Sequence, residues 1–156
     1  MSGSLLGPEI SIAVGQMLTE QVGLGFELQG GAGFGADWSS AGGGLGVLGV
    51  FYPFRALPLG IRASSGFNVT SLLRNDSELE SSEDPSGILG ARFAAGLFWE
   101  LDLTPSSRGS GGVGLRFGLD GHVLLGDDIV LGGVTGGLAM VWYFGLPKSR
   151  QRLPRG

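Results

Sequence analysis

The sequence predicts an all-β protein, an antiparallel up-and-down transmembrane β-barrel of about eight strands. Of the 156 residues only 15% are charged while 42% are hydrophobic, which leaves few ions for a water-exposed surface. No run approaches the roughly 20 consecutive apolar residues that a membrane-spanning helix needs. Large apolar residues instead alternate with small or polar ones along most of the chain, which is the pattern of strands with two unlike faces.

The first two strands show this alternation clearly. Ile10, Ile12 and Val14 share one face of the first strand, and after the polar turn 19–21 the second strand continues with Leu24 and its apolar neighbours. Glycines and polar residues occupy the opposite face. The seven expected strands cover residues 9–18, 22–36, 43–52, 58–70, 88–101, 112–125 and 129–144.

The remaining strands follow in order. The third is too apolar for its two faces to be distinguished. In the fourth, the neighbouring residues Ile61 and Arg62 lie on opposite faces of the strand. The longest polar segment, 71–87, is expected to be a loop. In the fifth strand Phe93 alternates with Arg92, and the sixth and seventh continue the pattern.

The charged residues of these strands all share the face that carries the small residues. A charge that faces the middle of a bilayer costs about 2 to 4 kcal/mol, so the wall of a membrane barrel must show this segregation. A soluble barrel would have the reverse arrangement, with apolar residues inside. The residues on the small-residue face are Glu27, Arg62, Arg92, Arg116, Asp120 and His122.

Strands can cross lipid only in a closed barrel, because every backbone N–H and C=O must be paired there. Seven strands are visible, whereas single-chain bacterial barrels have an even number. We therefore expect an eighth strand upstream of Met1. We also expect a signal peptide there, since residues 1–8 lack the features of a signal peptide. Alternatively, residues 1–8 and part of a neighbouring strand complete the ring.

The inward charges are expected to form a paired network, since isolated charges in a narrow lumen are costly. If the turn after the fifth strand is centred near residue 106, Arg92 faces Asp120, with Glu100 and Arg116 close by. A structural plug of salt bridges is favoured over a gated or selective pore. The expected lumen network comprises Glu27, Arg62, Arg92, Glu100, Arg116, Asp120 and His122.

The last strand carries a recognisable motif, in which a glycine is followed by alternating hydrophobic residues and a terminal aromatic. These residues are Gly137, Met140, Trp142 and Phe144. The motif resembles the C-terminal β-signal of outer-membrane proteins, and over residues 9–144 the chain is similar to the small OmpA-like or OmpX/OmpW-like barrels. That resemblance implies a bacterial outer membrane location, contact with its lipid and lipopolysaccharide, and recognition by the barrel-assembly machinery.

Beyond the barrel domain, 9–144, the chain continues as a basic tail, 145–156, in which the family pattern is not followed. Residues up to 144 hold six arginines against fourteen acidic residues, which disfavours nucleic-acid binding. Acidic residues in the 76–84 segment lack the spacing of an EF-hand, although beside lipopolysaccharide they could share divalent cations. The chain has no cysteine, and we expect no cofactor and no resident metal.

Enzymatic activity is not expected. His122 is the only histidine, and its pairing with Asp120 as an acid and base lacks any supporting nucleophile motif. The glycine pattern of residues 44–49 matches a dinucleotide-binding fingerprint, but residues 50–53 do not begin a helix, so a glycine-rich strand is expected. Aromatic residues near strand ends are expected to form an interfacial girdle, with a place in an ordinary core as the alternative. They are Phe51, Trp99, Trp142 and Phe144.

The expected role is structural or surface-interacting, with a narrow salt-bridged lumen. Two alternatives stay open. One is an outer-membrane channel for small solutes or hydrophobic ligands. The other is a soluble, lipocalin-like ligand-binding barrel, in which Phe117 and Leu119 would lie inside. The oligomeric state is not determined by these patterns.

Overall fold

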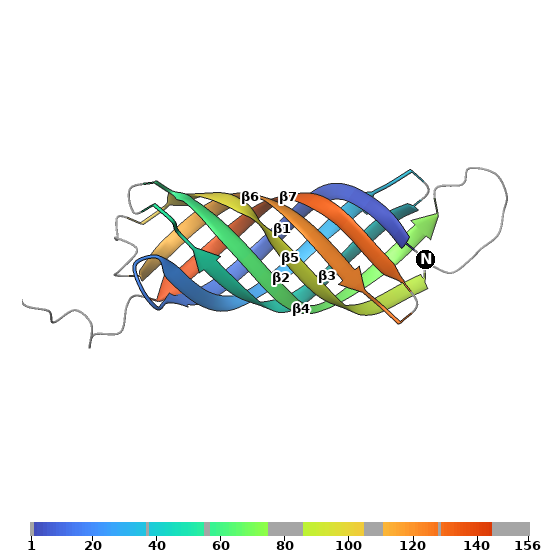
Figure 1. The fold of residues 1–156 in the computed structure, drawn as a ribbon, viewed down its shortest axis with the longest axis horizontal. Helices are drawn as coiled ribbons and strands as arrows, with labels where there is room; N and C mark the ends of the chain where they lie inside the picture. Colours follow the sequence, from blue (N-terminus) through green and yellow to red (C-terminus); the bar gives the residue numbers. More distant parts are fainter. Residues whose placement is uncertain are drawn as a thin grey trace, which may run out of the picture.

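The computed structural model describes residues 2–36, 38–54, 57–74, 86–104, 111–127 and 129–144. They form a single closed β-barrel (Figure 1), which confirms the all-β prediction. Within these ranges no helix has the length and apolarity needed to cross a membrane. The strands are β1 (Ser2–Met17), β2 (Val22–Phe34), β3 (Trp38–Phe51), β4 (Leu59–Arg74), β5 (Ser86–Asp102), β6 (Gly111–Leu125) and β7 (Val130–Phe144).

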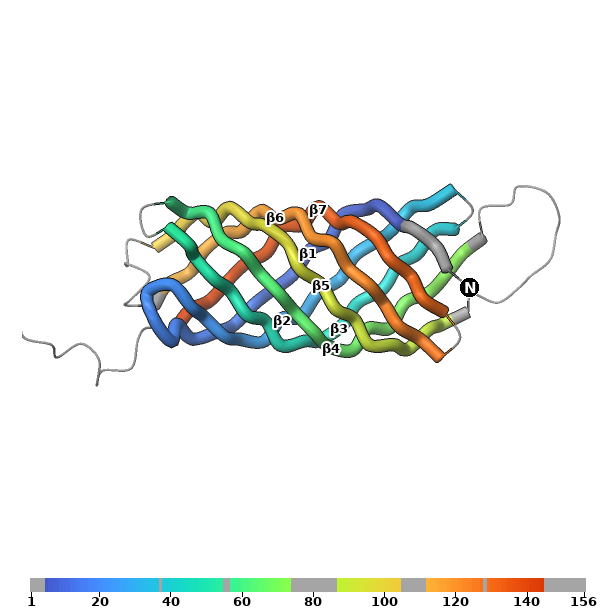
Figure 2. Tube along the Cα trace, viewed as in Figure 1, coloured from blue at the N-terminus to red at the C-terminus, as the bar shows by residue number. Residues whose placement is uncertain are grey.

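Each strand pairs with its neighbours in the chain, and β1 pairs with β7 to close the ring (Figure 2). Six of these pairs are antiparallel, but β1 and β7 run parallel. The expectation of a wholly antiparallel barrel is therefore wrong at one seam. In a ring of seven strands that alternate in direction, the first and last must point the same way.

The expected eighth strand is not needed to close the ring that the described residues form. β1 begins at Ser2, well before the expected residue 9, and its first residues pair with β7 from Ser2 opposite Val130 to Pro8 opposite Gly136. The early residues thus extend an existing strand. The seam they form with β7 continues to Gln16 opposite Phe144.

The two faces of the sheet are as unlike as the alternation predicts. Phe67 is 73% exposed and Ile10 is 68% exposed, and both point outward. The Arg92 and Arg116 side chains are buried inside the barrel. Phe117 and Leu119, expected inside a soluble ligand-binding barrel, instead lie on the outer face, which argues against that alternative.

Close approach between strands explains part of the glycine content. Gly46 lies directly opposite Gly66 on the inner face of β3 and β4. A Cβ atom on Gly66 would lie 2.4 Å from the Gly46 Cα and 2.2 Å from the Leu45 carbonyl oxygen. Only glycine fits at this contact, which lets the wall curve tightly around a narrow interior.

Inside, apolar clusters fill the two ends and polar residues fill the middle. We call the end where β1 begins the N-terminal end, and the end where β7 finishes the C-terminal end. The N-terminal cluster comprises Leu5, Leu72, Leu124 and Leu131, packed against Trp38, Ile88 and Ile129. The C-terminal cluster comprises Ala13, Met17, Leu48, Val50, Tyr52, Phe98, Ala139, Val141 and Tyr143.

Candidate functional site

The candidate site is the layer of charged side chains between the two apolar clusters. Each of these residues lies on the inward face of its strand, because it has the same parity as the buried residues around it. Six of the seven sequence-predicted network residues are fully buried, and His122 is half-buried. The buried charged residues are Glu9, Glu27, Arg62, Arg92, Glu100, Arg116 and Asp120.

Arg62 lies at the centre of this layer and contacts three carboxylates from three other strands. Its Nη1 is 3.0 Å from Glu27 Oε1, its Nη2 is 3.5 Å from Glu9 Oε1, and its Nε is 3.2 Å from Asp120 Oδ1. The Ser11 hydroxyl also donates a hydrogen bond of 2.8 Å to Glu27. These contacts tie β1, β2, β4 and β6 together across the lumen.

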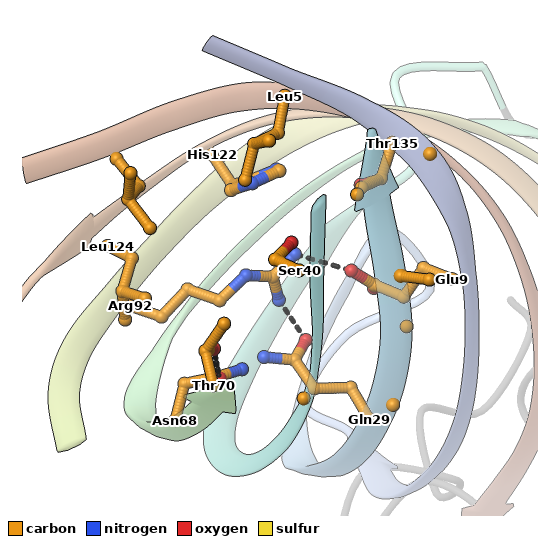
Figure 3. A pocket seen from close by; sticks show the side chains of 17 residues that line it. Leu5, Glu9, Gln29, Ser40, Asn68, Thr70, Arg92, His122, Leu124 and Thr135 are labelled. Atoms are coloured by element: carbon orange, nitrogen blue, oxygen red, sulfur yellow. Dashed lines mark hydrogen bonds and ion pairs between the residues drawn. The ribbon is translucent and has the colours of Figure 1, made fainter. Parts of the chain in front are cut away.

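Arg92 extends the network toward the N-terminal end. Its guanidinium donates hydrogen bonds to Glu9 and to the side-chain oxygen of Gln29 (Figure 3). Glu9 is thus shared between Arg92 and Arg62.

A second polar group adjoins the C-terminal cluster. Arg116 Nη2 lies 3.1 Å from Glu100 Oε2, and the Tyr52 hydroxyl donates to the same oxygen at 2.7 Å. The Tyr143 hydroxyl contacts Arg116 and is 2.7 Å from the Tyr52 hydroxyl. The Arg116 guanidinium carbon is 4.1 Å from the centre of the Phe98 ring, so a cation–π contact completes this end of the lumen.

The predicted pairing of Arg92 with Asp120 is wrong, whereas the proximity of Glu100 and Arg116 is confirmed. Glu100 lies directly opposite Arg116, and Arg92 lies opposite Leu124. The β5–β6 hairpin is therefore centred two residues later than the sequence suggested. Because the resulting slip is an even number of residues, every side chain keeps its face while its partner changes.

A cavity of about 70 Å³ separates the network from the N-terminal cluster. Polar side chains line it, among them Glu9, Gln29, Arg92, His122 and Thr135 (Figure 3). Leu5, Leu124 and Leu131 also line it, and a space of this size with polar groups on its wall can hold a few water molecules. In the part of the chain that the structure describes, neither His122 Nδ1 nor Thr135 Oγ1 has a hydrogen-bond partner.

The described residues show no hydrogen bond or ion pair between Asp120 and His122. Asp120 is engaged by Arg62, and His122 borders the cavity. The glycine-rich residues 44–49 lie within strand β3, which confirms the strand prediction. The described ranges contain no cluster of three or more side chains suited to hold a metal.

Several network members were missed from the sequence. Glu9 stood at the edge of the first predicted strand, although it has the same parity as the inward Ser11 and Ala13, which was a usable signal. Tyr143 alternates with the outward Trp142 in the same way. Tyr52 is the last residue of the predicted strand 43–52, whose faces could not be distinguished, so nothing in the sequence marked it.

The motif on β7 is split between the two faces. Gly137 lies on the inward face, whereas Met140, Trp142 and Phe144 are exposed on the outer face. Trp99 and Phe51 are also exposed near the same end, so a place in the core is wrong for these aromatics. The basic tail, 145–156, and the acidic segment 76–84 lie outside the described residues.

Comparison of the chain with protein-family models, with curated proteins and with solved structures finds no match.

Proposed function

We propose that this protein is a bacterial outer-membrane β-barrel with a closed lumen, and that its role is structural or surface-interacting rather than enzymatic. The observation that carries the proposal is the composition of the outer face. Of the charged strand residues whose side chains the structure describes, only Asp102 is exposed, and it is the last residue of β5. Large apolar side chains cover the wall between the strand ends. In water this surface would be costly, but in lipid it is favourable.

The dimensions of the barrel agree with this proposal. The strands contain 13 to 17 residues. At about 3.3 Å per residue and a tilt of about 40°, such strands rise roughly 33 to 43 Å, more than the apolar band of about 25 Å that a membrane barrel requires. Exposed aromatic residues, including Trp99 and Trp142, lie near the C-terminal end, where an interfacial girdle would form.

The filled interior favours a closed lumen, and it disfavours the alternative of a channel for small solutes or hydrophobic ligands. Apolar side chains occupy both ends, and ion pairs cross the middle. We also infer that β7 is the strand recognised by the barrel-assembly machinery, since its outward residues Met140, Trp142 and Phe144 remain exposed. Membrane lipid and lipopolysaccharide would then contact the outer face.

A pair of arginine substitutions on β5 tests the membrane proposal. Phe93 lies in the middle of the strand and Leu101 near its end, and both face outward with similar exposure, 52% and 47%. In lipid vesicles, Phe93→Arg should lower the free energy of unfolding by about 2 to 4 kcal/mol, whereas Leu101→Arg should lower it by about 0 to 1 kcal/mol. The measurement is denaturant unfolding of the refolded chain. Equal costs at the two positions, or a chain that stays folded and monomeric without detergent, would count against the proposal.

A further inference from the structure

The lumen contains more carboxylates than guanidinium groups. Glu100 and Arg116 pair with each other near the C-terminal end. In the middle layer, only two guanidinium groups face three carboxylates, so one negative charge has no counter-charge among the described residues. The carboxylates are Glu9, Glu27 and Asp120, and the guanidinium groups are Arg62 and Arg92. A buried charge without compensation is strongly destabilising.

The excess charge is concentrated at Asp120. Glu27 receives hydrogen bonds from Arg62 and Ser11, and Glu9 is in contact with both arginines of the layer. Among the described residues Asp120 forms an ion pair only with Arg62, and the 3.2 Å contact between Arg62 Nε and Asp120 Oδ1 lacks hydrogen-bond geometry. Neither atom has another hydrogen-bond partner within the described part of the chain. Asp120 is therefore the least compensated carboxyl of the three.

A second buried group without a partner lies beside it. Thr135 on β7 is the direct cross-strand partner of Asp120, and both side chains face inward. Thr135 is 7% exposed, and its Oγ1 has no hydrogen-bond partner among the described residues. Direct partners place their Cβ atoms about 5 Å apart. A neutral carboxyl has an O–H that a carboxylate lacks, so it can donate a hydrogen bond to Thr135 Oγ1.

The space beside Asp120 limits what the missing positive charge can be. The void there, bounded by Glu9, Ser11, Arg62 and Asp120 among others, has no room for a sphere the size of a water molecule. The larger cavity of about 70 Å³ is not lined by Asp120. A hydrated cation therefore does not fit against this carboxyl, whereas a proton does.

We propose that the folded barrel retains one proton on the Asp120 carboxyl at neutral pH, so that the stability of the barrel depends on pH through this residue. The proton comes from solvent during folding, because an aspartate in the unfolded chain is ionised at neutral pH. Since the folded state then binds more protons than the unfolded state, stability should fall as pH rises from the ordinary aspartate pKa of about 4, through neutral pH, until the folded carboxyl ionises. The inward charged groups on the strands around Asp120 are Glu9 on β1, Glu27 on β2, Arg62 on β4, Arg92 and Glu100 on β5, and Arg116 and His122 on β6. Strand β3 has no charged residue, and β7 presents Thr135 and the titratable Tyr143.

Infrared spectroscopy of the full chain, refolded in detergent at neutral pH, tests the proposal directly. The wild-type protein should show the C=O stretch of one protonated carboxyl, and Asp120→Asn should remove it. The proposal is overturned if the wild-type spectrum lacks the band, or if the band persists in Asp120→Asn. Stability that depends on the choice of sodium over a bulky organic cation, without the band, would identify a metal cation instead.

A matched pair of variants supplies a second readout. Asparagine has the shape and neutrality of the protonated acid but takes up no proton on folding. Asp120→Asn should therefore match the wild-type denaturant midpoint near pH 4, exceed it at pH 7, and lose the decline with rising pH that the wild type shows. Glu27→Gln removes a paired carboxylate, and it should lower the midpoint at pH 7 or prevent folding. Equal effects of the two substitutions, or failure of Asp120→Asn to fold, would overturn the proposal. The test does not depend on whether the barrel resides in a membrane.

Discussion

At the scale of the residue, most inward polar groups are shared between several partners. Arg62 contacts three carboxylates, and Glu100 accepts hydrogen bonds from Tyr52 and Arg116. Arginine suits this position because its planar guanidinium presents several donors in a rigid geometry, which a lysine ammonium cannot reproduce. Loss of one partner would leave the others buried without compensation, so these side chains act as a unit.

The contact between Gly60 and Phe98 gives a prediction at this scale. A Cβ atom on Gly60 would lie 2.3 Å from the Phe98 ring, which in turn packs on Arg116. Gly60→Ala should therefore displace the ring and lower the free energy of unfolding by about 1 to 3 kcal/mol. Gly136→Ala is the matched control, because a Cβ there meets nothing within 4 Å and should change stability by less than about 0.5 kcal/mol. Denaturant unfolding measures both, and similar costs would contradict the packing described here.

At the scale of the element, the seam between β1 and β7 is the only parallel pair in the barrel of described residues. Its register runs from Ser2 to Gln16, although parallel pairing is slightly less stable per residue than antiparallel pairing. Closure of the ring by seven strands brings the two ends of the sheet, β1 and β7, into direct contact. This contact can be tested separately from the strand assignments.

Engineered cysteines test this closure, since the natural chain has none. Ile12 lies opposite Met140 across the seam, and Leu115 lies one strand further around the ring, about 10 Å from Ile12. Ile12→Cys with Met140→Cys should be joined by oxidation or by a short thiol crosslinker, as read from electrophoretic mobility. Ile12→Cys with Leu115→Cys should not. If the first pair fails to crosslink in the folded protein, another strand separates β1 from β7.

At the scale of the whole molecule, the barrel is closed at three levels along its axis. Apolar clusters fill the two ends, and the ion-pair layer lies between them, with a cavity of about 70 Å³ beside it. Permeation of a hydrated ion would require all three levels to open. A lumen of this kind is a packed core with polar residues in the middle.

The purified barrel should therefore give no steady ion conductance when it is inserted in a planar bilayer, with an open porin as the positive control. The expected trace is the baseline of the bare membrane, because apolar clusters close both ends of the lumen and ion pairs cross its middle. Defined conductance steps that scale with protein concentration would contradict a closed lumen and would favour the channel alternative.

The same scales separate what could be predicted from what could not. Alternation with a period of two residues determines which face each side chain occupies, so the outward position of Phe93 and the inward position of Arg116 followed from local sequence. Tyr52 could not be assigned to a face because the predicted strand that it ends, 43–52, is apolar on both faces. The pairing of Arg92 failed because it depended on the centre of a turn, which carries no such period.

The sequence by itself determined the strands, the apolar outer wall and the inward placement of the charges, because each of these depends only on a residue and its near neighbours in the chain. Only the tertiary structure decided that seven strands close the ring and that Arg62, not Arg92, meets Asp120. Those features depend on the stagger between strands and on contacts across the lumen between residues far apart in the chain. The alternating pattern is the same for every even shift of register, so it cannot choose among them.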